Sequence, residues 1–196
     1  MSARLLDLWL AAVLATPGLT AIRDPVEARR ALLEDSLAGA GLVAGFDGAV
    51  VDVGSGGGAP GIPLAAALPE RPVTLLEANG RKCAFLEQWA AELPNLSVVR
   101  GRAEEQEPER FGVAVAKALA QPPVAAEWCL PLVVPGGAVV LWVGPSAEPE
   151  RVAAVAAKLN AELAAAPPGF LVLRKLGPTP PGFPRRPGMA RKRPLA

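Results

Sequence analysis

The sequence predicts an α/β fold in which helices cover both faces of a mostly parallel sheet. From residue 49 onward, short runs that are continuously apolar and rich in β-branched residues alternate with segments of helical length. Such runs are typical of strands buried on both faces, and their alternation with helices is typical of a parallel sheet. The length of 196 residues fits one domain. We therefore expect a single domain over residues 1–196, made of a helical extension (1–40), an α/β core (49–175) and a basic, proline-rich tail (176–196).

Residues 3–15 are expected to form an amphipathic helix. Apolar side chains recur there at helical spacing, and Asp7 lies on the opposite face. Because Asp7 also interrupts the apolar run, a helix docked on the domain is a better interpretation than a secretory signal peptide. No stretch of the chain has the length of a membrane span. We expect a cytoplasmic protein without a membrane partner.

A second N-terminal helix is expected over residues 25–38. It begins at Asp24-Pro25, where a capping residue is followed by proline at the first helical position. Gly39 and Gly41 are expected to end this helix, because glycine commonly follows a helix C-terminus.

The core is expected to contain five strands and then a final strand pair. The same alternation of patterns places the five strands at residues 49–53, 73–77, 97–100, 113–116 and 138–143. The helices between and after them are expected at residues 59–68, 81–92, 124–132 and 147–160. Pro135-Gly136-Gly137 is expected to be a turn. Phe170–Lys175 forms a further strand that pairs with residues 161–166 in a hairpin.

The loops at one edge of this sheet are expected to hold the functional site. Ligands of open α/β sheets bind outside the carboxyl ends of the strands, near the switch in strand order. The sequence therefore directs attention to the loops that follow Val53, Glu77, Arg100 and Ala116.

The glycine-rich loop after the first strand is the strongest local indication of a ligand. Gly54, Ser55, Gly56 and Gly58 lie between a strand and a helix, so that a ligand can approach the backbone closely. Glu77 ends the next strand, where a carboxylate can accept hydrogen bonds from both hydroxyls of a ribose. A turn of purely structural importance is the alternative, and we favour a nucleoside cofactor.

Two nucleoside cofactors fit this loop. Gly54-x-Gly56-x-x-Ala59 matches the dinucleotide fingerprint of NAD-dependent oxidoreductases. Three features favour S-adenosylmethionine instead. Asp52 places a carboxylate that suits a cation, Ala103-Glu104-Glu105 would surround an adenine, and Pro135-Gly136-Gly137 is frequent in methyltransferases.

Several kinds of catalysis are excluded by composition. The chain has no histidine and no tyrosine, which rules out serine–histidine and cysteine–histidine catalysis and histidine-bound metals. Cys83 and Cys129 lie in apolar surroundings without ligand-like spacing. We expect no metal, and the sequence assigns no catalytic residue.

The basic residues are concentrated in the tail. The first 162 residues hold 13 basic and 19 acidic residues, whereas the last 34 hold seven basic and no acidic ones. This asymmetry is typical of an arm that binds a polyanion, and a solvated, disordered tail is the alternative. We expect the tail to bind RNA without affecting cofactor binding, through Arg185, Arg186, Arg191, Lys192 and Arg193.

Five longer segments carry a resemblance to a known family. They are GLTAIRDPVEARRALLEDSL, VVDVGSGGGAPGIPLAAALPERPVTLLEANGRKCAFLEQWAAEL, VVRGRAEE, LPLVVPGGAVVL and the tail PRRPGMARKRPLA. Together they resemble the bacterial 16S rRNA guanine-N(7) methyltransferases (the RsmG or GidB family). The resemblance implies a Rossmann-like, S-adenosylmethionine-dependent methyltransferase fold. It also implies methylation of guanine N7 in 16S rRNA, either free or in an assembling small subunit, by a chain that we expect to be a monomer.

The resemblance also implies a set of cofactor contacts. Carried over by position, these are Gly54, Ala59, Ala103, Glu104 and Lys117, with Glu77 on the ribose.

Four residues differ from those usual in the family at the same positions, namely Leu32, Ala59, Lys117 and Val143. A non-catalytic relative that binds S-adenosylmethionine and RNA is therefore the second hypothesis.

Overall fold

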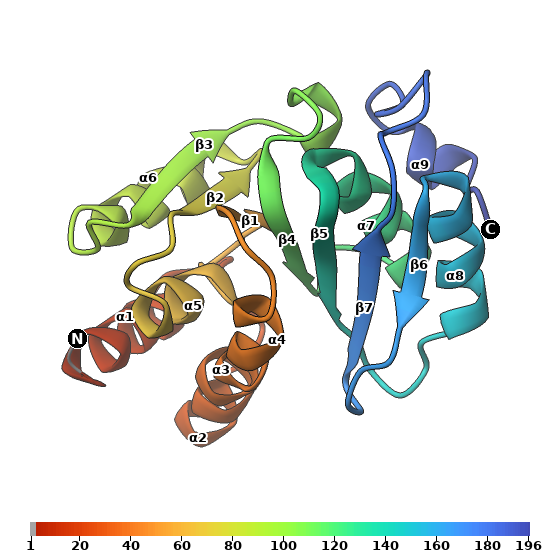
Figure 1. Cartoon of the computed structure of the whole chain (residues 1–196). Helices are drawn as coiled ribbons and strands as arrows, with labels where there is room; N and C mark the ends of the chain where they lie inside the picture. The colour runs from red at the N-terminus through yellow and green to blue at the C-terminus, as the bar shows by residue number, and fades with distance from the viewer. Residues whose placement is uncertain (1–2) are drawn as a thin grey trace.

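The computed structural model describes residues 3–196 and is built on one central sheet (Figure 1). The strand order is β3-β2-β1-β4-β5-β7-β6. All neighbouring pairs from β3 to β5 are parallel, and β7 is antiparallel to both β5 and β6. The expected α/β fold is confirmed. The strands are β1 (Val50–Val53), β2 (Val73–Glu77), β3 (Leu96–Arg100), β4 (Phe111–Lys117), β5 (Val133–Trp142), β6 (Ala161–Ala164) and β7 (Phe170–Lys175).

Helices cover both faces of the sheet. One face packs against the N-terminal helices, α5 and α6, and the other packs against α7, α8 and the tail. Alternate residues of β1 supply the two cores, because Val50 points to the first and Val51 to the second. The α-helices are α1 (Ala3–Ala15), α2 (Pro25–Ala28), α3 (Asp35–Ala38), α4 (Ala40–Ala44), α5 (Gly61–Ala67), α6 (Gly80–Ala90), α7 (Pro122–Cys129), α8 (Pro149–Lys158) and α9 (Met189–Lys192).

The centre of the sheet contains the switch in strand order. The central strand β1 lies between β2 and β4, with Val50 opposite both Val73 and Val113. The chain moves outward through β2 and β3 and then returns to add β4 on the other side. The carboxyl ends of these strands therefore meet at one edge, where the sequence predicts the site.

The N-terminal helices differ in detail from the expectation. Asp24 caps α2 by accepting a hydrogen bond from the backbone nitrogen of Glu27 at 2.7 Å, as predicted. A π-helical segment, Arg29–Glu34, joins α2 to α3 within the predicted second helix. Gly39 follows α3, and its lack of a side chain leaves room for the Trp142 ring. The prediction that Gly41 ends the helix is wrong, since Gly41 lies inside α4 with open space around it.

Pro135-Gly136-Gly137 does not form the predicted turn before β5. The three residues lie within the strand, where the pairing with β4 shifts between Phe111 and Val113. Gly136 has a φ of 88°, a left-handed conformation that glycine adopts readily. The glycines thus permit an irregularity in the strand rather than a reversal of the chain.

The end of the chain is folded onto the domain. The predicted pairing of the last two strands is confirmed as the antiparallel β6–β7 pair. After β7 the chain turns back over α7 and forms the single-turn helix α9, in which Ala190 is buried (Figure 1). The alternative of a solvated, disordered tail is corrected by this packing, although residues 176–188 have no regular secondary structure.

Within residues 3–196, no helix combines the length and apolar character needed to cross a membrane. The same residues contain no cluster of three or more side chains suited to hold a metal ion.

Candidate functional site

The glycine-rich loop crosses the carboxyl end of β2. The backbone nitrogen of Gly54 donates to the carbonyl oxygen of Leu76 at 2.7 Å, and that of Gly58 donates to Ser55 at 2.7 Å. Gly54, Gly56 and Gly58 all have φ between 57° and 103°. Side chains rarely tolerate this conformation, so the path of the loop depends on glycine at these positions.

Glu77 holds the loop in place with both carboxylate oxygens. Its Oε2 atom accepts from the backbone nitrogen of Gly56 at 2.9 Å, and Oε1 accepts from that of Asn79 at 2.8 Å. The residue is 8% exposed. A carboxylate offers about four lone-pair sites, so two backbone donors leave capacity for the hydroxyl groups of a ligand.

A pocket of about 310 Å³ opens beside this carboxylate, and we call it the Glu77 pocket. Its walls come from the loops after β1, β2, β3 and β4, the four loops that the sequence indicates. The predicted residues Gly54, Glu77, Ala103 and Glu104 meet there. Two carboxylates therefore face one cavity, where they can accept hydrogen bonds from hydroxyl or amino groups.

A second pocket of about 420 Å³ lies along the glycine loop, and we call it the Trp9 pocket. Helix α1 reaches the loop here, because Trp9 is fully buried and its Nε1 donates to the carbonyl oxygen of Gly57 at 2.9 Å. Gly54, Lys82 and Ala118 line both pockets. The two cavities are thus neighbours that share the loop as a common wall.

The remaining predicted cofactor residues are divided between the Trp9 pocket and the core. Ser55, Gly56, Ala59 and Lys117 line the Trp9 pocket, together with Leu32. Gly58 lines neither of the two pockets. A side chain at Gly58 would collide with Ile62, so this glycine allows the loop to pack against α5.

Lys117 lies at the end of β4, and its ammonium group points to the N-terminal helices. It forms an ion pair with Asp35 and donates to the carbonyl oxygen of Ala31 in the π-helical segment. In this position Lys117 connects the sheet to the helical extension along the wall of the Trp9 pocket.

Asp52 does not face the site, contrary to the expectation that its carboxylate would attract a cation. It is 1% exposed and lines neither of the two pockets. Its Oδ2 atom accepts from the backbone nitrogen of Gly61 at 3.0 Å, and Oδ1 has no hydrogen-bond partner. Burial raises the pKa of Asp52 to about 7 because it disfavours the charged form. Asp52 therefore anchors the start of α5 from beneath the loop.

We predict that Asp52→Asn removes part of the pH dependence of stability. A folded-state pKa of about 7, against an ordinary value of 3.8, means that the folded protein holds this proton more tightly. The stabilisation is complete below about pH 4 and is lost as the pH rises toward 7. Between pH 5 and pH 8 the wild type should lose on the order of 2 kcal/mol from this group, at about 1.4 kcal/mol per pKa unit.

Chemical denaturation of both proteins at pH 5 and pH 8 measures this difference. The asparagine variant, which cannot ionise, should gain stability relative to the wild type as the pH rises. An identical pH dependence in the two proteins would contradict the prediction. Cofactor affinity is the control and should change less than about threefold, because Asp52 lines neither pocket.

The predicted RNA-binding residues occupy two kinds of environment. Arg186, Arg191, Lys192 and Arg193 are exposed. The guanidinium of Arg185 is instead paired with the buried carboxylate of Glu127. Since this pair occupies the group, the structure gives Arg185 a part in fastening the tail rather than in binding a phosphate.

Several residues of the Glu77 pocket were not predicted as cofactor contacts from the sequence. They include Lys82, Trp128, Gly188 and Arg191. Lys82 lies in the first turn of α6, which Asn79 caps. Because Lys82 is close to Glu77 in the sequence, its place in the pocket could have been predicted. Trp128 and the tail residues have no such signal, because the fold brings them there from distant positions.

Comparison with known proteins agrees with this architecture and identifies a family. Residues 6–164 match the family described as GidB, rRNA small subunit methyltransferase G. A protein of that name from Synechococcus sp. (strain JA-2-3B'a(2-13)), Ribosomal RNA small subunit methyltransferase G, is 35% identical. The alignment covers 92% of this chain and 79% of the relative.

Solved structures of methyltransferases share the fold. A predicted O-methyltransferase from Agrobacterium tumefaciens superimposes with a TM-score of 0.57 at 19% identity, covering 71% of this chain and 78% of that one. A T. thermophilus 16S rRNA N2 methyltransferase, in complex with AdoMet and guanosine, superimposes with a TM-score of 0.51 at 16% identity. That match covers 69% of this chain and 37% of the other. At such identities the likeness concerns the fold alone.

Proposed function

The chain belongs to the GidB family of small-subunit rRNA methyltransferases, and from this membership we propose that it methylates N7 of a guanine in 16S rRNA with S-adenosylmethionine. The observation that carries the proposal is the Glu77 pocket, which brings together Gly54 of the glycine loop and two carboxylates at the switch in strand order. Because the proposed substrate is ribosomal RNA, we propose that the protein acts in the cytoplasm.

The residues of the Glu77 pocket fit the adenosine part of this cofactor. Glu77 retains acceptor capacity for the two ribose hydroxyls after binding Gly56 and Asn79. Ala103 and Glu104, at the start of a short 3-10 helix, also line this pocket. We propose that Glu77 binds the ribose and that the Ala103–Glu104 backbone and side chains surround the adenine.

The NAD-dependent alternative has less support from the fold. Classic dinucleotide-binding sheets have the strand order 3-2-1-4-5-6. Here β7 is inserted between β5 and β6 and runs antiparallel to both. The methyltransferase structures described above share this fold with the chain.

The Trp9 pocket is the place that we propose for the target guanine. It adjoins the Glu77 pocket at Gly54, Lys82 and Ala118, so a base there would lie next to the cofactor. Val13, Leu19 and Ile22 supply apolar walls, which suit the faces of a planar base.

The proposed reaction needs alignment more than proton transfer. When bound, S-adenosylmethionine supplies a methyl group on a positively charged sulfur. Guanine N7 carries a lone pair and no proton, so the chain needs no general base, in accord with its lack of histidine and tyrosine. The pocket residues would hold the two reactants in line, and proximity and orientation can supply roughly 7–11 kcal/mol of a barrier.

RNA contact is assigned to the exposed part of the tail. Arg186, Lys192 and Arg193 present cations to solvent near the Glu77 pocket, whose wall includes their neighbours Gly188 and Arg191. Because N7 lies in the deep major groove of A-form RNA, we propose that the target guanine is unpaired when it is bound.

We predict that the purified protein transfers labelled methyl from S-adenosylmethionine to unmodified 16S rRNA or small subunits, with 7-methylguanosine as the product. Nucleoside digestion and mass analysis identify the modified base. Another methylated nucleoside would refute the N7 assignment. Cofactor binding without transfer to either substrate would favour the non-catalytic relative, in line with the departures at Leu32, Ala59, Lys117 and Val143.

A further inference from the structure

The tail is fastened to the domain by a buried ion pair. Arg185 donates from Nε to Oε1 of Glu127 and from Nη2 to Oε2, both at 2.6 Å. The Glu127 side chain is 3% exposed and that of Arg185 is 20% exposed. Bidentate pairs of this kind are among the stronger polar contacts in proteins. Arg185 therefore connects the tail firmly to α7.

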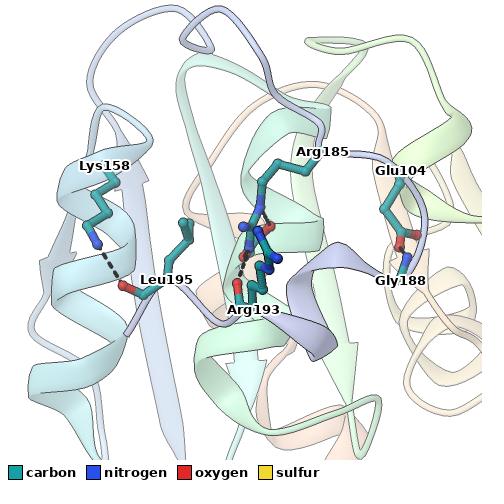
Figure 2. Close-up of polar contacts among 7 residues, drawn as sticks. Glu104, Lys158, Arg185, Gly188, Arg193 and Leu195 are labelled. Atoms are coloured by element: carbon teal, nitrogen blue, oxygen red, sulfur yellow. Dashed lines mark hydrogen bonds and ion pairs between the residues drawn. The ribbon is translucent and has the colours of Figure 1, made fainter.

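The same guanidinium also closes the tail on itself. Arg185 Nη2 donates to the carbonyl oxygen of Arg193 at 2.9 Å, so residues 185 and 193 are held together with α9 between them (Figure 2). Farther along, Lys158 donates to the carbonyl oxygen of Leu195 at 2.6 Å. The backbone that carries the exposed cations of the tail is thus held against the domain.

The docked tail supplies one wall of the Glu77 pocket. The backbone nitrogen of Gly188 donates to Oε1 of Glu104 at 3.1 Å, as Figure 2 shows. The Arg191 guanidinium lies 5.1 Å from the centre of the Trp128 ring, within the range of a cation–π contact. Gly188, Arg191 and Trp128 all line the pocket.

We propose that the docked tail links cofactor binding to RNA binding, with Arg185 and Glu127 as the positioning residues. This inference rests on the proposed function, because it takes the Glu77 pocket as the cofactor site. Gly188 and Arg191 face the cofactor only when the tail is docked, in contrast to the expectation from the sequence that the tail does not affect cofactor binding. Arg186, Arg191, Lys192 and Arg193 form a compact basic surface for RNA in the same state.

If two ligands both bind better to the state in which the tail is docked, each ligand strengthens the binding of the other. The apparent dissociation constant of each ligand is its intrinsic value divided by the fraction of molecules whose tail is docked. In the wild type, whose ion pair keeps the tail docked, this fraction is near one and the mutual effect is small. A variant with a loosened tail should reveal the coupling, which must be reciprocal.

The test uses the full-length chain, S-adenosylhomocysteine and an unmodified 16S rRNA fragment. Glu127→Gln removes the buried charge that holds Arg185, and Arg191→Ala removes a pocket wall without changing the ion pair. We expect both variants to bind S-adenosylhomocysteine roughly tenfold more weakly by calorimetry. In Glu127→Gln the docked state is only partly populated, and in Arg191→Ala a side chain of the pocket wall is missing. Adding the RNA fragment should restore most of the affinity in Glu127→Gln and change little in the wild type.

Lys192→Ala is the matched control on α9. Its side chain is exposed and lines neither the Glu77 pocket nor the Trp9 pocket. This variant should weaken RNA binding and leave the affinity for S-adenosylhomocysteine within about twofold. An equal loss of cofactor affinity in Lys192→Ala and Arg191→Ala would overturn the proposal.

The outcomes separate this inference from the proposed function. A wild type that binds no S-adenosylhomocysteine, or makes no 7-methylguanosine, contradicts the proposed function. A wild type that does both, while Arg191→Ala and Glu127→Gln bind the cofactor product normally, overturns the inference alone. If Glu127→Gln does not fold, normal binding by the surface variant Arg191→Ala is sufficient to overturn it.

Discussion

Glu77→Ala is expected to weaken S-adenosylmethionine binding by about 1–3 kcal/mol, roughly five- to 150-fold. The substitution removes the proposed ribose acceptor. It also frees the backbone nitrogens of Gly56 and Asn79, which the carboxylate holds at 2.9 and 2.8 Å. The glycine loop would then lose a side-chain contact that positions it and keep its backbone hydrogen bonds to Leu76 in β2. Isothermal calorimetry with S-adenosylmethionine measures the change.

Two further variants show which part of the loss comes from the ribose. Glu77→Gln keeps one carbonyl acceptor but turns an amide donor toward a backbone donor, so an intermediate loss is expected. Glu92→Ala removes an exposed carboxylate outside both pockets and should leave affinity unchanged. Unchanged affinity in Glu77→Ala would mean that other residues bind the ribose.

Gly61→Ala is expected to cause the largest loss of stability among the substitutions considered. A side chain at residue 61 would overlap Leu75 and come within 2.7 Å of Oδ2 of Asp52. Helix α5 would have to move away from the sheet, against the hydrogen bond from Gly61 to Asp52. Overpacking of this kind costs about 1–3 kcal/mol, which corresponds to a fall in Tm of roughly 2–4 °C per kcal/mol at this chain length.

Gly41→Ala is the matched control for this prediction. Gly41 lies inside α4 with no atom within 4 Å of the added carbon. Alanine is favoured over glycine within helices by roughly 0.5–1 kcal/mol, so this variant should melt at or above the wild-type temperature. Equal melting temperatures for Gly61→Ala and the wild type would show that α5 can shift without cost.

The local parts of the site could be predicted because their signals are contiguous. The glycine loop and Glu77 lie at the ends of consecutive strands, and neighbouring parallel strands bring their carboxyl ends to one edge. Lys117 was predicted at the correct strand end, but its ion pair with Asp35 was not, since the partners are 82 residues apart in the chain. The same reason hid the pairing of Arg185 with Glu127, which are separated by 58 residues.

The sequence by itself determined the order of strands and helices, the glycine loop and the acidic end of β2. These follow from short-range periodicity, from the few backbone conformations that glycine alone adopts readily, and from charge placement. Only the tertiary structure decided that Asp52 is buried beneath the loop and that the basic tail forms a wall of the Glu77 pocket. Both features depend on which segments, far apart in the sequence, pack against each other in the folded protein. A local sequence pattern does not specify those contacts.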